Sequence, residues 1–128
     1  MNILDCVTYF DEEVILKIRF NILNEHVSKF IITEGEYDHR GNKRELNFDI
    51  NKYPEFKDKI IYLPVKKFPN LHDPWSMLKY QRDFALNEIN KYDDNTFVIV
   101  SDVDEIPKPE KIYEFIKSNH KYGVFEQL

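Results

Sequence analysis

The chain of 128 residues has one cysteine, three glycines and no apolar run long enough to cross a bilayer. Cys6 has no partner for an internal disulfide, and its apolar neighbours predict a small buried hydrophobic residue. The scarcity of glycine argues against long flexible linkers. A membrane-spanning helix needs about 18 apolar residues, and residues 1–5 lack the basic region of a signal peptide. We therefore expect a cytoplasmic protein without a membrane segment.

The sequence also lacks an excess of basic charge. Its formal net charge of −5 gives no electrostatic reason to expect nucleic acid or an anionic membrane as partner. Basic residues gather only locally, at residues 40–44 and at Lys66 and Lys67. These clusters are compatible with an anionic small molecule as the ligand. The hydrophobic content of 42% is that of a globular protein, and the length suits one domain over residues 1–128.

Runs of apolar, β-branched and aromatic residues alternate with helical patterns along the chain. Helices are expected after a cap at Asp11 to about residue 24, from Pro74 after a cap at Asp73 to about residue 91, and over residues 110–117. Strands are expected at residues 3–10, 29–33, 59–65, 96–100 and 122–128. This order predicts an α/β fold, with a mainly parallel sheet flanked by helices and ligands bound beyond the carboxyl ends of its strands.

The apolar spacing also predicts which helix faces pack inward. In the first helix, apolar residues at near-helical spacing are Val14, Ile15, Ile18, Phe20, Ile22 and Leu23. In the second helix, one broad face is expected to hold Trp75, Leu78, Arg82, Leu86 and Ile89. Trp75 is interpreted as a packing anchor, with sugar stacking as the alternative. The four histidines show no metal-ligand spacing, and we assign them no site.

An acidic cluster, Asp102 and Asp104, follows the strongest strand pattern in the chain. One residue separates the two aspartates, so on a strand-like backbone both side chains face the same way. Their carboxylates repel each other, and a divalent cation relieves that repulsion. Oxygen ligands suit Mg²⁺ or Mn²⁺, to which nucleotide phosphates supply further ligands. The alternative is a solvated acidic loop without function.

Six short segments of the chain together form a recognisable pattern. They are residues 5–12 (DCVTYFDE), 18–20 (IRF), 30–34 (FIITE), 73–75 (DPW), 81–82 (QR) and 101–107 (SDVDEIP). In this order they resemble glycosyltransferase family 17, the family of the β-1,4-mannosyl-glycoprotein N-acetylglucosaminyltransferases. The resemblance implies a GT-A-like, Rossmann-type fold, a UDP-GlcNAc-like donor, a glycan acceptor and inversion at the anomeric carbon. It implies that Asp104 ligates the metal directly, while Asp102 contacts the ribose or a metal-bound water.

The other residues predicted to bind the donor lie at strand ends or on a helix. Thr8 and Tyr9 end the first strand, where GT-A enzymes cradle the nucleotide, and core packing is an equal interpretation for Tyr9. Glu34 ends the second strand and accepts hydrogen bonds either from the ribose or base or from the backbone as a cap. Arg82 pairs with donor phosphate or with the acidic cluster, or it is a surface arginine whose stem covers the core.

No residue is predicted as the general base that an inverting transfer needs. Family members continue well past the aspartate motif, so we expect this chain to be an incomplete domain. We expect it to bind the donor without transferring sugar. One alternative is a non-catalytic domain that binds sugar nucleotides. Another is a phosphohydrolase with Asp102 as nucleophile and Asp104 as acid or base. That motif normally lies near the start of its domain, so the second alternative is less favoured.

Overall fold

Within residues 1–124, which the computed structural model describes, four strands form one sheet. The strands lie in the order β3-β2-β1-β4, and each neighbouring pair is parallel. The predicted α/β class is therefore confirmed, and the all-parallel sheet is compatible with a GT-A-like domain. The bounds are β1 (Asn2–Thr8), β2 (Lys29–Gly35), β3 (Ile60–Val65) and β4 (Thr96–Val100).

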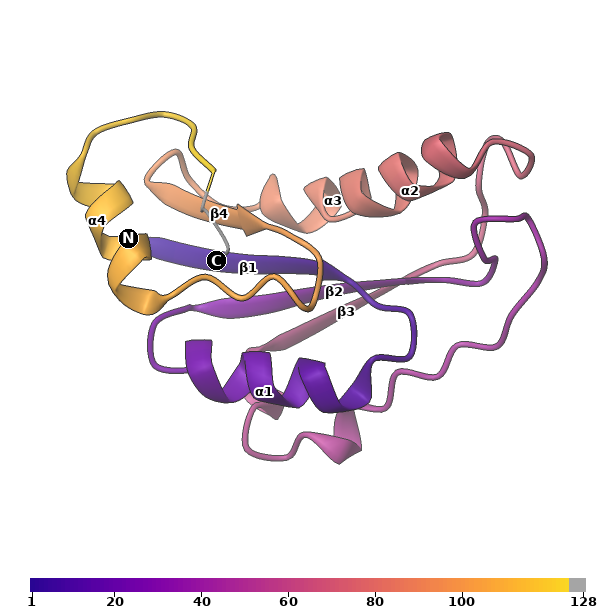
Figure 1. Ribbon diagram of the computed structural model, residues 1–128, viewed down its shortest axis with the longest axis horizontal. Coiled ribbons are helices and arrows are strands. Elements are labelled where there is room, and N and C mark those ends of the chain that lie inside the picture. The colour runs from indigo at the N-terminus through magenta and orange to yellow at the C-terminus, as the bar shows by residue number, and fades with distance from the viewer. Residues whose placement is uncertain (125–128) are drawn as a thin grey trace.

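Helices cover both faces of this sheet. Their bounds are α1 (Glu13–Leu23), α2 (Pro74–Asp83), α3 (Leu86–Ile89), α4 (Pro109–Lys117) and the short 3₁₀ helices η1 (Ile50–Lys52) and η2 (Lys57–Lys59). Figure 1 shows α1 on one face and α2 with α3 on the other, while α4 lies near the N-terminus. Parallel neighbours need such crossovers, because a tight turn cannot join two parallel strands.

The side chains of β1 divide the core into two clusters. Successive side chains of a strand point to opposite faces of the sheet. Ile3 and Val7 therefore pack on the side of α1, whereas Leu4 and Cys6 pack with Ala85 on the side of α2 and α3. Cys6 is 4% exposed, which confirms that it is buried, and this burial raises the pKa of its thiol to about 12.

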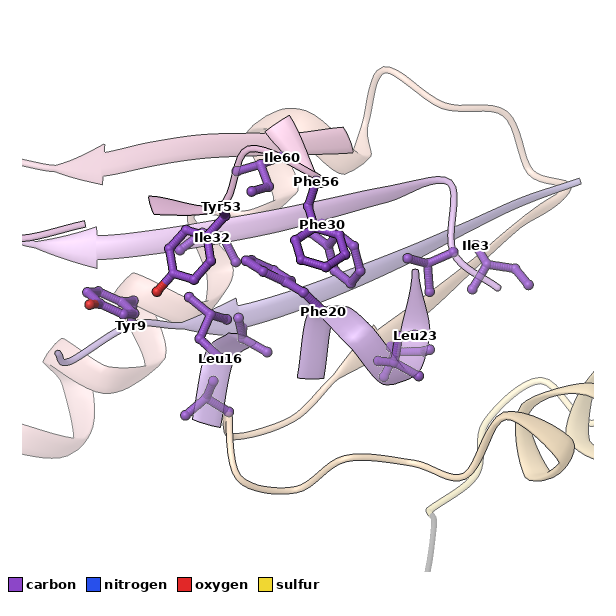
Figure 2. Close-up of a cluster of buried hydrophobic side chains, with 14 of the residues drawn as sticks. Ile3, Tyr9, Leu16, Phe20, Leu23, Phe30, Ile32, Tyr53, Phe56 and Ile60 are labelled. Atoms are coloured by element: carbon purple, nitrogen blue, oxygen red, sulfur yellow. The ribbon is translucent and has the colours of Figure 1, made fainter. Parts of the chain in front are cut away.

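An aromatic cluster holds α1 against the sheet (Figure 2). The ring of Phe20, which is fully buried, lies 4.6 Å from that of Phe30 on β2, measured between ring centroids. It also lies 5.1 Å from the ring of Tyr53 and 5.3 Å from that of Phe56. The segment between η1 and η2 thus packs on the same helix face as the sheet does.

The start of α1 differs from the prediction. Asp11 is not its cap: the backbone of Asp11 has a φ of 71°, in the left-handed region, and the helix begins two residues later. The Asp11 carboxylate instead accepts hydrogen bonds from Arg44 (2.7 Å) and Asn47 (3.0 Å). These partners lie far away in sequence, so local capping rules could not reveal them.

The buried face of α1 is also narrower than its apolar pattern predicts. Val14 is 76% exposed, and Ile18 and Ile22 are more than two-fifths exposed. The buried residues of α1 are Leu16, Arg19, Phe20 and Leu23. The helix therefore faces the sheet along a stripe with spacing of three and four residues that includes a charged side chain.

The inward face of α2 was predicted wrongly. Asp73 caps the helix as expected, since its carboxylate accepts the N–H groups of Trp75 and Ser76. However, Trp75 is 80% exposed, and the inward residues are Met77 and Gln81. The observed inward face lies roughly half a helical turn from the predicted one. The prediction considered apolar spacing only and therefore did not place the polar Gln81 on the inward face. Its side-chain amide donates a hydrogen bond to the Thr33 carbonyl (3.1 Å).

Three element ends also differ. β1 ends at Thr8 and not at residue 10. The single helix predicted from residue 74 to about 91 is divided into α2 and α3, because in the turn between them the backbone N–H groups of Ala85 and Asn87 donate to carbonyls three residues earlier instead of four. The strand predicted at residues 122–128 is wrong for residues 122–124, which have no regular structure, and residues 125–128 lie outside the described residues. Residues 36–47 form a loop in which Tyr37 and Lys43 make one antiparallel bridge. None of the helices within residues 1–124 has the length and apolar character that spanning a membrane requires.

The aromatic cluster generates a prediction about stability. Replacing Phe20 by Ala should lower the free energy of unfolding by about 3–5 kcal/mol, because it removes a fully buried ring and leaves a cavity. The matched control on the same helix is Val14→Ala, which should change it by less than about 0.5 kcal/mol. Urea denaturation followed by circular dichroism measures both values. Equal effects of the two substitutions would contradict the observed orientation of α1.

Candidate functional site

The predicted site residues gather at the carboxyl edge of the sheet. β1 ends there with Thr8, β2 carries Thr33 and Glu34 just before its last residue, Gly35, and β4 leads into Ser101 and Asp102. Figure 1 shows the chain after β4 turning back beside the end of β1. Because all the strands are parallel, their carboxyl ends share one edge, and ligands of such sheets bind there.

The two aspartates lie in a tight turn and not on an extended backbone. The N–H of Glu105 donates to the Asp102 carbonyl (3.0 Å), and the N–H of Asp102 donates to the Glu105 carboxylate (3.1 Å). Val103, between the aspartates, is buried, while Asp102 and Asp104 are exposed on either side of it. The turn is therefore fixed by an apolar side chain below and presents two carboxylates to solvent.

A buried arginine holds this turn from below. Nη1 of Arg19 donates to the carbonyl oxygens of Asp102 (3.0 Å) and Glu105 (2.8 Å), and Nη2 donates to Oγ of Ser101 (2.7 Å). Arg19 comes from α1, and its side chain is fully buried. Since the guanidinium is charged and planar, it fixes several acceptors of the turn at once.

The same arginine forms a two-pronged ion pair with Asp5 in the middle of β1. Nε donates to Oδ2 (2.8 Å) and Nη2 to Oδ1 (2.7 Å), and both side chains have no exposed surface. Each N–H of the guanidinium thus has an acceptor, as a buried charge requires. Our sequence reasoning assigned neither residue a role. Two features of the sequence could have indicated this pair: an aspartate inside an apolar strand pattern, and an arginine among the apolar residues of a helix.

A small recess lies beside the turn, on the α2 face of the sheet. Thr8, Thr33, Arg82 and Ser101 contribute its polar groups, and Cys6, Val7, Ala85 and Val100 complete its lining. Oγ1 of Thr33 is buried and has no hydrogen-bond partner among residues 1–124. The guanidinium of Arg82 lies 4.0 Å from the Asp102 carboxylate. Two of the predicted site residues, Thr8 and Arg82, therefore line the recess, and Asp102 adjoins it through Arg82.

Tyr9 and Glu34 lie on the opposite face, away from this recess. The ring of Tyr9 is buried and packs edge-on against Phe48, at 5.5 Å between centroids. The buried Glu34 carboxylate accepts the backbone N–H groups of Asn47 (2.8 Å) and Phe48 (3.0 Å). It also accepts the Tyr62 hydroxyl (2.7 Å). Burial and this hydrogen bond hold the pKa of Tyr62 above its usual range, so the hydroxyl stays a donor. This arrangement favours packing for Tyr9 and loop positioning for Glu34.

Negative charge accumulates around the acidic turn. Burial raises the pKa of Glu12, at the start of α1, and the charges of Asp11 and Asp104 raise it further, against the lowering effect of a backbone hydrogen bond at Phe10. The Asp104 carboxylate has no hydrogen bond or ion pair with the described part of the chain. Within residues 1–124, no three side chains of histidine, cysteine, aspartate or glutamate converge as a complete metal site.

The fold and this edge define the class of α/β proteins that bind a ligand beyond the carboxyl ends of a parallel sheet. The family profile of glycosyltransferase family 17 matches residues 1–125, which is nearly the whole chain. The chain therefore belongs to glycosyltransferase family 17, and the resemblance found in its sequence is confirmed. Comparisons with curated proteins and with solved structures gave no significant match. Membership of this family supports glycosyl transfer over the phosphohydrolase interpretation.

The buried ion pair generates a prediction that a double-mutant cycle can test. Arg19→Met and Asp5→Ala should each lower the free energy of unfolding by about 3–5 kcal/mol, because each leaves a buried charge without its partner. The double variant should lose clearly less than the sum of the two. Urea denaturation measures all four free energies. Lys79→Ala, which removes an exposed pair with Asp83, is the control and should have little effect. Additive losses at Arg19 and Asp5 would contradict the coupling.

Proposed function

We propose that this chain binds a UDP-sugar, in the first place UDP-GlcNAc, together with Mn²⁺ or Mg²⁺ for inverting transfer to a glycan acceptor. In this proposal the domain is of the GT-A type. One observation carries it: Thr8, Arg82 and Ser101 line a recess that adjoins Asp102, at the carboxyl edge of the sheet. A cation beside two exposed carboxylates at this edge suits the diphosphate of a nucleotide and its metal.

The carboxylates fit a metal that is shared with the diphosphate. The Asp102 side chain is 60% exposed, and Asp104 is also exposed, so both can accept a ligand without unfolding the turn. Mg²⁺ typically takes one or two carboxylates, several waters and substrate phosphates, and it does not need a closed protein cage. The absence of a third protein ligand within residues 1–124 agrees with this type of site.

The residues of the chain then have separate roles. Asp104 and Asp102 hold the metal, and Arg82, which already lies 4.0 Å from Asp102, reaches the diphosphate. The Thr8 hydroxyl offers a hydrogen bond to the nucleotide, whereas the Ser101 hydroxyl donates to the Glu105 carbonyl (3.0 Å) and helps to fix the turn. When bound, the divalent cation supplies electrostatic stabilisation of the departing diphosphate. Arg19 keeps the turn in place, so the carboxylates need no rearrangement when the donor binds.

The first test of this proposal concerns the metal. Mn²⁺ should bind weakly alone and more tightly with UDP, because diphosphate oxygens complete its ligands. Asp104→Asn should weaken the UDP-linked binding by at least about 100-fold, since loss of an outer-shell partner alone costs about 10–100-fold. Isothermal calorimetry measures the binding, and urea denaturation should show an unchanged free energy of unfolding.

A matched control lies at the other edge of the sheet. Asp58 is an exposed aspartate of η2, just before β3 begins, so it lies at the amino edge. Asp58→Asn removes the same charge as Asp104→Asn and should leave the binding of Mn²⁺ with UDP unchanged. Unaltered Mn²⁺–UDP binding in the Asp104 variant would overturn the proposed metal site.

The second test concerns the donor. Thermal denaturation should show a melting temperature that rises with ligand concentration, as linkage requires of a ligand that binds only the folded state. We expect UDP and UDP-GlcNAc to stabilise the chain more than GDP-mannose does. Arg82→Ala should reduce the stabilisation by UDP, because the diphosphate loses its nearest cation. Greater stabilisation by GDP-mannose would refute the assignment of the donor and leave the fold unaffected.

A further inference from the structure

The only tryptophan of the chain, Trp75, is 80% exposed at the start of α2. A single exposed apolar side chain needs no explanation by itself. The position of Trp75 is what makes it informative. Met77 and Gln81 turn the opposite side of α2 toward the sheet, so the indole ring lies on the outward face of the helix.

Trp75 and Arg82 lie on the same face of this helix. They are seven residues apart, which is nearly two full turns, and the separation along the axis is about 10 Å. Arg82 in turn lies 4.0 Å from the Asp102 carboxylate. The outward face of α2 therefore runs from an exposed aromatic ring to the side chain that borders the acidic turn.

The direction of α2 places the tryptophan on the outer side of the site. β3 ends at the carboxyl edge of the sheet, and α2 begins after the following loop and runs back toward the start of β4. Figure 1 shows the first turn of α2 on the side of the loops that follow β2 and β3. Trp75 therefore stands farther out from the strand ends than Arg82 does.

The backbone that carries the ring is fixed. The Asp73 carboxylate accepts the N–H groups of Trp75 (3.1 Å) and Ser76 (3.4 Å) and the Ser76 hydroxyl (2.8 Å). Pro74 occupies the first position of the helix, where its fixed φ suits helical geometry. An exposed ring on a capped first turn is presented to solvent at little further cost in backbone entropy.

We infer that Trp75 is a stacking platform for a sugar unit of the acceptor glycan, at a distance from the unit that reacts. A sugar ring has one face of C–H groups, and a flat, amphipathic indole offers a matching surface. Lys79, whose Nζ pairs with the Asp83 carboxylate at 2.7 Å, follows on the same side of the helix, and this exposed pair suits the hydroxyl groups at the edges of sugar rings. An oligosaccharide spans the separation of about 10 Å along α2, whereas a single sugar does not. This inference rests on the proposed function.

Since the chain has one tryptophan, its fluorescence reports on this ring alone. The experiment titrates the chain, with UDP and Mn²⁺ present, with N-acetylglucosamine, mannose and glucose oligosaccharides of one to four units, under selective excitation of tryptophan. We expect at least one tri- or tetrasaccharide to shift the emission, and the single sugars to leave it unchanged. Calorimetry with that oligosaccharide should show about tenfold weaker binding by Trp75→Ala and a smaller loss by Trp75→Phe.

The control replaces an exposed aromatic residue on another helix. Tyr113 of α4 is 41% exposed, and Tyr113→Ala should bind the oligosaccharide as the unsubstituted chain does. Calorimetry with UDP and Mn²⁺ on the same samples separates the two proposals: loss of Trp75 should leave that binding unchanged. Failure of the unsubstituted chain to bind UDP would overturn the proposed function. Normal UDP binding with no response of Trp75 to any oligosaccharide, or with unaltered glycan binding by Trp75→Ala, would overturn the platform alone.

Discussion

The position of the candidate site depends on the buried ion pair of Arg19 and Asp5, which joins a strand, a helix and a turn. Asp5 lies in the central strand, Arg19 comes from the helix that covers it, and the remaining donors of the guanidinium hold the turn after β4. A charge without exposed surface is tolerated only when all its hydrogen-bonding groups have partners. Displacing the turn would leave buried donors unpaired, so the position of Asp102 and Asp104 is coupled to the packing of the core.

The two faces of the sheet consequently differ in what they do. On the α1 face, Arg19 and Glu34 use buried charges to position loops, and their hydrogen bonds are made within the chain. On the α2 face, Thr8, Thr33 and Arg82 line a small recess, and Oγ1 of Thr33 has no hydrogen-bond partner within residues 1–124. This division of roles between the two faces suits a binding site, because buried hydrogen bonds on the α1 face fix the positions of the groups on the α2 face.

The sequence determined the order and type of the main elements. Apolar runs bounded by polar segments identified the four strands, and their alternation with helices implied a parallel sheet, since parallel strands need crossovers. The cap at Asp73 followed from local chemistry, in which a carboxylate satisfies free N–H groups at a helix start. The pair of aspartates after β4 was also evident, because its residues are close together in the chain, whereas their tight turn was not, since we expected an extended backbone there. The family was evident from six short segments that occur in one order along the chain.

The tertiary structure alone decided which partners the charged residues found. Arg19 meets Asp5 and the turn at residues 101–105, and Asp11 meets Arg44, across separations in sequence that no local pattern encodes. The structure likewise decided the orientation of α2: Met77 and Gln81 face the sheet, and the Gln81 amide donates to the Thr33 carbonyl. That choice left Trp75 in solvent. Periodicity measures apolar spacing only, so it cannot register a polar residue whose burial depends on a distant hydrogen-bond partner.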